Sequence, residues 1–239
     1  MKKALFIVLG LFLINITAFS ENYNVYQPQN YSLKNDAEEK ILFILDFSNS
    51  MSEYLENEPK YILMINTMKK LLSTLPPQTK VGLRVYGHRN GFTMKDACKA
   101  SKNINSICSN NCQNIASSLD NLAPSGMTPI TYSLKQAVKY DFLGFRGRKH
   151  IILLTDGGEN CDESPCTYAM ELIKTRRDII IDVIAFNISD EDDLAQLECA
   201  SLVTSGKFYT ANTACELANS LTQSLNSRKE VEAKIIQNP

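Results

Sequence analysis

Short apolar runs that alternate with helical patterns constrain the fold of this chain more than any other feature. Ile41–Leu45, Ile151–Leu154 and Ile179–Phe186 are continuously or almost continuously apolar, as strands buried on both faces of a sheet are. Val81–Tyr86 is a similar run, and a helical pattern that ends at Pro76 precedes it. The alternation predicts an α/β fold: a doubly wound, mostly parallel sheet with helices on both faces.

Two weaker patterns complete the expected sheet. Ile104–Ile107 is a candidate edge strand inside an irregular, cysteine-containing stretch, and Phe208 and Tyr209 begin a last short strand. The sequence therefore predicts a six-stranded sheet. No internal repeat or low-complexity linker divides residues 39–228, which we expect to form one domain. Residues 229–239 are expected to form a polar C-terminal tail.

The N-terminus has the pattern of a secretory signal peptide. Lys2 and Lys3 precede the apolar run Ala4–Ile14, and Ala18-Phe19-Ser20 supplies small residues at a cleavage site. A run of this length is too short to cross a bilayer as a helix. We expect residues 1–20 to be removed near Ser20, residues 21–38 to form an irregular leader, and the mature chain, without a transmembrane anchor, to be periplasmic or secreted.

Charge and cysteine content narrow the function classes. The formal net charge of −1 argues against a broad basic surface for nucleic acid. Seven cysteines fit an oxidising compartment: Cys98, Cys108, Cys112, Cys161, Cys166, Cys199 and Cys215. Because the number is odd, at least one is expected to stay free or to pair with another chain. Disulfides are favoured over zinc because only His88 and His150 are available as nitrogen ligands, while the pairing cannot be read from spacing.

Polar side chains gather where ligands bind in such sheets, beyond the carboxyl ends of the strands. Asp46, Ser48 and Ser50 follow the first strand, Thr128 lies in a turn before a helix, and Asp156 follows Ile151–Thr155. All five offer oxygen and none offers nitrogen or sulfur. This donor set suits a hard cation, Mg²⁺ first and Mn²⁺ or Ca²⁺ next.

Together these residues resemble the complete metal-ion-dependent adhesion site of the von Willebrand factor A (VWA) family, over roughly residues 39–228. Stretches such as Gly126-Met127-Thr128-Pro129-Ile130 and Thr155-Asp156-Gly157-Gly158 resemble its bacterial exported branch. Cys108, Cys112 and Cys215 depart from that branch. The resemblance implies a Rossmann-like sheet with strand order 3-2-1-4-5-6.

The resemblance also implies a ligand scheme: direct contact with the metal by Ser48, Ser50 and Thr128, and contact through water by Asp46 and Asp156. Such an inner shell carries almost no negative charge, so the cation would attract an anionic oxygen from outside. The expected function is binding rather than catalysis: a VWA domain that recognises an Asp or Glu carboxylate on a protein or surface ligand.

The sequence leaves two other functions open. A metal-dependent hydrolase would use the same cation as a Lewis acid, but no motif supplies a general base. A metal-free scaffold would leave the five oxygen side chains without a shared purpose. Nearby, His88 and Arg89 are expected to order their own loop, and Glu159, Asp162 and Glu163 to form a solvated acidic loop.

Overall fold

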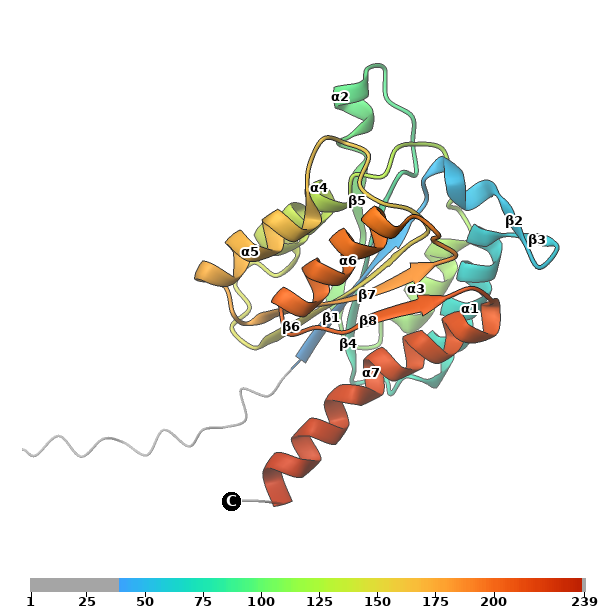
Figure 1. Ribbon diagram of the computed structural model, residues 1–239. Helices are drawn as coiled ribbons and strands as arrows, with labels where there is room; N and C mark the ends of the chain where they lie inside the picture. Colours follow the sequence, from blue (N-terminus) through green and yellow to red (C-terminus); the bar gives the residue numbers. More distant parts are fainter. Residues whose placement is uncertain (1–38, 238–239) are drawn as a thin grey trace, which may run out of the picture. The chain divides into compact units, whose positions relative to one another are not determined.

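The computed structural model describes the backbone of residues 39–237 and the side chains of residues 39–226. The expected signal peptide and leader lie outside the described residues. Six strands form one sheet in the order β5-β4-β1-β6-β7-β8, drawn in Figure 1. Their bounds are β1 (Glu39–Asp46), β4 (Lys80–Tyr86), β5 (Ser101–Cys108), β6 (Arg148–Thr155), β7 (Ile179–Phe186) and β8 (Phe208–Ala211).

This order is the expected 3-2-1-4-5-6 once the small hairpin of β2 (Tyr54–Leu55) and β3 (Glu58–Pro59) is left out of the count. β1 is central and pairs in parallel with β4 and β6. β5 is the edge strand beside β4, antiparallel to it, and its register shifts twice along the pair. The α/β class and the doubly wound, mostly parallel sheet are therefore confirmed.

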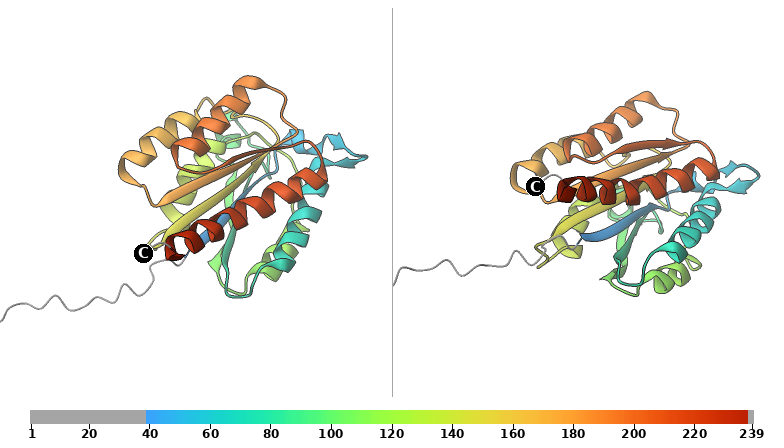
Figure 2. Two further views of the ribbon diagram at one scale, coloured as in Figure 1. Left: turned by 60° about the horizontal axis from the view of Figure 1, so that its bottom comes forward. Right: turned by 90° about the horizontal axis from the view of Figure 1, so that it is seen from below.

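Helices cover both faces of the sheet, as Figure 2 shows from two further directions. One face carries α1 (Lys60–Thr74), α3 (Cys112–Leu119) and α7 (Ala214–Gln237). The other carries α4 (Ile130–Gln136), the π-helical turn η2 (Ala137–Asp141), α5 (Pro165–Thr175) and α6 (Glu191–Val203). Two short helices, η1 (Asn49–Ser52) and α2 (Met94–Ala97), follow β1 and β4.

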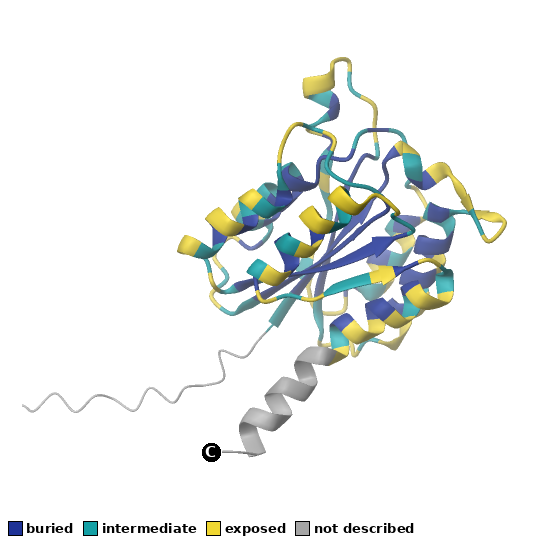
Figure 3. Ribbon diagram, in the orientation of Figure 1, coloured by how far each residue is buried: buried dark blue, intermediate teal, exposed yellow. Residues whose placement is uncertain are grey.

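Alternate residues of β1 supply the two cores. Phe43 and Leu45 pack toward α1, whereas Leu42 and Ile44 pack toward α4, and all four side chains are fully buried. Figure 3 shows the result: buried strands between helices whose outer faces are exposed. Continuous apolar runs in the sequence thus correspond to strands buried on both faces.

One helix end differs from expectation. α7 continues to Gln237 through the segment expected as a polar tail. The extension follows from composition, because residues 227–237 are rich in good helix formers and contain neither Gly nor Pro. Within the described residues, no helix is both long and apolar enough to span a membrane.

Candidate metal centre

Four of the five expected metal residues, Asp46, Ser48, Ser50 and Asp156, meet at the carboxyl edge of the sheet, because β1 and β6 end there side by side. Asp46 is the last residue of β1, and Asp156 follows the last residue of β6. Ser48 pairs with Gly126 in an isolated parallel bridge, and the Asn49 amide donates to the Gly126 carbonyl at 3.0 Å. This bridge attaches the loop that contains Thr128 to the loop that follows β1.

Asp46 is fully buried and accepts three hydrogen bonds. The Ser48 amide donates to its Oδ1 at 2.6 Å, while the Tyr86 and Thr155 hydroxyls donate to its Oδ2 at 3.0 and 2.8 Å. Burial, followed by the negative charge of Asp156, raises the pKa of Asp46 to about 7. In the absence of a cation, the site therefore holds a proton more tightly than an ordinary carboxylate does.

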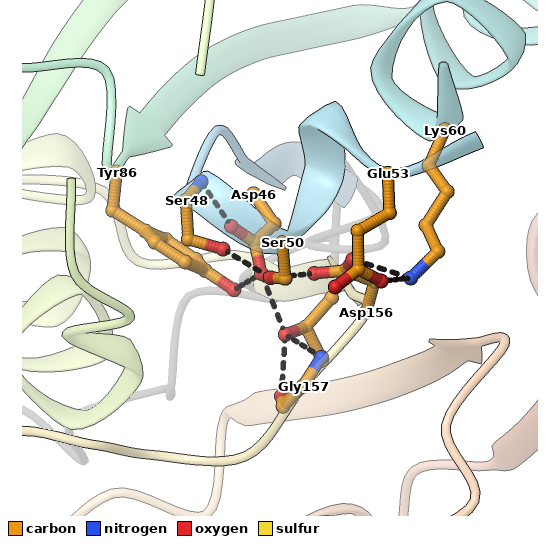
Figure 4. Close-up of polar contacts among 9 residues, drawn as sticks. Asp46, Ser48, Ser50, Glu53, Lys60, Tyr86, Asp156 and Gly157 are labelled. Carbon is orange, nitrogen blue, oxygen red and sulfur yellow. Dashed lines mark hydrogen bonds and ion pairs between the residues drawn. The ribbon is translucent and has the colours of Figure 1, made fainter. Parts of the chain in front are cut away.

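A chain of hydrogen bonds joins the serines to the second carboxylate, as Figure 4 shows. The Ser48 and Ser50 hydroxyl oxygens lie 3.0 Å apart, and the Ser50 hydroxyl donates to Asp156 Oδ1 at 2.7 Å. Burial raises the pKa of Asp156, although the Ser50 hydrogen bond opposes the shift. Thr128 joins the group through its loop: its side chain is buried, and its amide donates to Asn160 Oδ1 at 2.7 Å.

Lys60, the first residue of α1, is a member of the site that the sequence pattern did not reveal. Its ammonium lies 3.0 Å from Asp156 Oδ2 and 2.8 Å from Glu53 Oε2, and its side chain is only 6% exposed. Burial lowers the pKa of Lys60, but its hydrogen bond to Glu53 and the charge of Asp156 outweigh burial and raise it. The position of Lys60 at the start of a helix is the one sequence feature that could have indicated this role. The helix dipole disfavours a positive charge at the N-terminus, so a lysine there is expected to have acidic partners.

These residues fit a hard divalent cation. The carboxylates of Asp46 and Asp156 are buried close enough that each raises the energy of the other's charge, and the hydroxyls of Ser48 and Ser50 lie between them. The single ammonium of Lys60 offsets only part of this negative charge. An oxygen-only set with uncompensated charge is the chemistry that Mg²⁺, Mn²⁺ or Ca²⁺ selects.

The loop after Asp156 is more ordered than its acidic composition suggested. Glu159 is partly buried, and its two carboxylate oxygens accept from the amides of Thr131 and Cys161 at 2.7 and 3.0 Å. It therefore connects the metal-side loop to the start of α4. The expectation of a solvated acidic loop holds for Asp162 and Glu163, which are exposed.

The loop after β4 is held by its own ion pair. The Arg89 guanidinium donates to both carboxylate oxygens of Asp96 at 3.0 and 3.2 Å, which agrees with the expected role of Arg89 in ordering this loop. His88 lies half-buried beside it, and burial lowers the pKa of its imidazole. Asp96 lies within the short helix α2, and Cys98, the first cysteine of a disulfide, directly follows the end of that helix.

Two disulfides cross-link the loops and helices near this edge of the sheet. Cys98–Cys161 links the end of α2 to the loop after Asp156, and Cys166–Cys199 links α5 to α6. Cys108, Cys112 and Cys215 are free thiols. Zinc coordination is not supported in the described part of the chain, where His, Cys, Asp and Glu form no group of three or more suited to a metal.

Comparison with known proteins establishes the family. Residues 40–224 match the family model of the von Willebrand factor type A domain. The uncharacterized protein YwmC of Bacillus subtilis (strain 168) is 31% identical over 188 residues, which cover 77% of this chain and 81% of YwmC. This chain belongs to the von Willebrand factor type A family, and its sheet has the topology expected of that family.

Solved structures share the fold. Proximal thread matrix protein 1 from the mussel byssus, with a zinc-occupied MIDAS motif (metal-ion-dependent adhesion site), aligns with a TM-score of 0.56 and 23% identity over 74% of this chain and 42% of that chain. The pilus adhesin SpaC from Lactobacillus rhamnosus GG, in its open conformation, aligns with a TM-score of 0.60 and 13% identity over 78% of this chain and 29% of that one. This chain spans less than half of either solved chain, so these likenesses concern the fold alone.

Proposed function

We propose that this protein binds a protein or surface ligand through a divalent cation at the carboxyl edge of its sheet, with Mg²⁺ the first candidate. Ser48, Ser50 and Thr128 would hold the cation directly, and Asp46 and Asp156 would hold it through water. When bound, the cation supplies an electrophilic position that accepts an Asp or Glu carboxylate of the partner.

The observation that carries this proposal is the arrangement of hydroxyls and acids. Ser48 and Ser50 present adjacent hydroxyl oxygens, and the Ser50 hydroxyl is hydrogen-bonded to buried Asp156. Neutral hydroxyl ligands leave a cation with most of its positive charge, while the two carboxylates nearby keep it in place. A partner carboxylate is then attracted without any catalytic base.

Neighbouring side chains hold the acids in position. The Tyr86 and Thr155 hydroxyls fix one oxygen of Asp46, so its other oxygen is turned toward the Ser48 amide. Two further carboxylates lie at this edge. Glu53 accepts a hydrogen bond from the Lys60 ammonium, and Glu159 accepts hydrogen bonds from two backbone amides. These contacts favour a binding site over the alternative, a metal-dependent hydrolase.

The test is calorimetric titration of MgCl₂ and MnCl₂ into wild type, Ser50→Ala and Thr128→Ala. Both variants should lose most of the binding heat. Asp120→Asn is the matched control, since Asp120 is exposed and paired only with Lys69 at the surface, and it should bind like wild type. Equal heats in all four proteins would remove the metal site.

A second measurement separates binding from catalysis. A partner captured from the native envelope with Mg²⁺ should be released by EDTA and should not be retained by Thr128→Ala. A partner retained under every condition would mean that binding bypasses this site. Turnover of generic ester or phosphate substrates that disappears with EDTA and in Thr128→Ala would instead identify a hydrolase.

Export is part of the proposal. The charged start, apolar run and small residues before Ser20, together with two disulfides in the domain, support a periplasmic or secreted mature chain. Mass spectrometry of the protein from its native host should find a mature N-terminus close to residue 21. An intact chain beginning at Met1 in the cytoplasm would contradict this.

A further inference from the structure

A basic hollow lies at the end of the sheet opposite the metal centre. It has a volume of about 510 Å³ and lies between the loop before β6 and the turn before β7. Because β6 and β7 are parallel and the metal centre follows their carboxyl ends, the hollow lies at their amino ends. An eight-residue strand spans about 26 Å, so the two sites are well separated.

Cations outnumber acids in this hollow. Lys139, Arg146, Lys149 and Arg176 line it with a single carboxylate, that of Asp178. Arg176 Nε donates to Asp178 Oδ1 at 2.9 Å, and the buried Lys149 ammonium contacts the other oxygen of Asp178. The hydrogen bond from Arg176, reinforced by Lys149, holds the pKa of Asp178 well below its usual range. The one acid is therefore already engaged.

Two of the cations remain without an acidic partner. Lys139 and Arg146 are exposed, and neither forms an ion pair with any described residue. The net charge of the whole chain is only −1, so this concentration of positive charge is local. Local basic clusters on a nearly neutral protein attract anionic surfaces over about one Debye length.

Apolar side chains project from the same loop. Leu143 is 78% exposed and Tyr140 is 52% exposed, and both lie between Lys139 and Arg146 in the sequence. Gly144, with φ +75°, provides the left-handed turn that follows Leu143. An exposed leucine beside a tyrosine, flanked by basic residues, is the composition found where proteins meet the interfacial region of a bilayer.

Phe145 connects the apolar tip to further cations. The Lys40 ammonium lies 4.2 Å from the centre of the Phe145 ring, and the Lys149 ammonium lies 5.4 Å from it. These cation–π contacts hold positive charge next to the loop. The loop is thus apolar at its tip and basic around its base.

We propose that this basic hollow and its loop dock on an anionic lipid surface. Lys139 and Arg146 contact lipid phosphates, while Tyr140 and Leu143 enter the headgroup region. This function is additional to metal-dependent ligand binding, and it uses the other end of the domain. Charge complementarity favours a lipid over a neutral partner, and the exposed leucine favours a lipid over a soluble phosphate.

The test is co-sedimentation of residues 21–239 with phosphatidylcholine vesicles, with and without phosphatidylglycerol, in EDTA. Binding should require phosphatidylglycerol and weaken with salt. A basic residue near an anionic surface contributes roughly fivefold in affinity, so Lys139→Gln with Arg146→Gln should reduce binding by roughly 25-fold. Lys95→Gln with Lys99→Gln is the matched control: it removes the same charge from exposed positions near α2 and should leave vesicle binding unchanged.

Further arms separate a lipid surface from a soluble phosphate as the occupant of the hollow. Leu143→Ser should weaken vesicle binding several-fold, and excess inorganic phosphate should not abolish it. If phosphate abolishes vesicle binding and Leu143→Ser binds vesicles normally, the hollow is a phosphate pocket and the proposal is overturned. Vesicle binding that does not depend on phosphatidylglycerol would also overturn the proposal. Thr128→Ala should bind vesicles normally, so failure of the metal-site proposal leaves this one unaffected. Thermal melting of each variant verifies folding.

Discussion

Lys60→Met gives a sharp test of the metal centre, because Lys60 places a buried positive charge where a cation is expected to bind. The ammonium lies 3.0 Å from Asp156 Oδ2. At an effective dielectric constant of about 20, charges at that distance attract by about 5 kcal/mol before desolvation is counted. Removing one partner of a buried pair costs about 3–5 kcal/mol, because the other charge is left uncompensated.

We expect the metal-free variant to lose about 3 kcal/mol of unfolding free energy, the lower end of that range, since Glu53 is 67% exposed and easily rehydrated. Mg²⁺ affinity should change in the opposite direction. With the ammonium gone, the cation meets no positive neighbour and neutralises an Asp156 carboxylate that has lost its partner. We expect affinity to rise by at least about tenfold, which corresponds to 1.4 kcal/mol.

The assay is urea unfolding with EDTA or MgCl₂, combined with calorimetric titration of MgCl₂. Lys69→Met is the matched control, because Lys69 pairs with Asp120 at the surface, and such exposed pairs contribute about 1 kcal/mol or less. It should lower the free energy of unfolding by no more than about 1 kcal/mol and leave Mg²⁺ affinity unchanged. Weaker Mg²⁺ binding by Lys60→Met would refute the reasoning and assign Lys60 the role of orienting Asp156 for the metal.

Three further predictions concern pH, backbone and thiols. Because the folded pKa of Asp46 is about 7 against an unfolded value of 3.8, its contribution to metal-free stability is fully present below pH 3.8 and is lost as pH rises through 7. Mg²⁺ must displace that proton, so calorimetry should show affinity falling about tenfold per unit below pH 7, and a flat profile would contradict the assignment. Gly126→Ala would place a Cβ 2.4 Å from the Arg89 carbonyl oxygen. We therefore expect this variant to have a lower melting temperature and weaker Mg²⁺ binding. An unchanged melting temperature and an unchanged Mg²⁺ affinity would show that this loop is not tightly held. Alkylation of the native chain should modify three thiols, and opening the disulfide between Cys98 and Cys161, which lie 63 positions apart in the sequence, should cost about 4 kcal/mol in urea unfolding.

Much of the fold could be predicted because its signals are local. Ile179–Phe186 coincides with β7 residue for residue, since a buried strand needs an apolar side chain at nearly every position. The serines and the two aspartates of the site were also predictable. Each follows a recognisable strand, and the carboxyl ends of parallel strands converge.

The rest depends on contacts between segments far apart in the chain. Lys60 resembles any solvated lysine until the fold brings Asp156, 96 residues away, against its ammonium. The role of Glu159 could not be predicted for the same reason, because its hydrogen-bond partner Thr131 lies 28 residues earlier in the sequence. The β2–β3 hairpin was missed because its strands have two residues each, too few for an alternating pattern, and because its turn places Glu56 in the left-handed region.

The irregular pairing of β5 bears on how this protein behaves among many copies of itself. An edge strand with a long regular ladder invites edge-to-edge association with a second molecule. Here the register shifts opposite Leu83 break the ladder, and exposed Lys102 adds charge to the same strand. The other edge, β8, has only four residues. Both edges of the described sheet are therefore poor templates for edge-to-edge pairing, so the protein can be held at high concentration without fibre formation through its sheet.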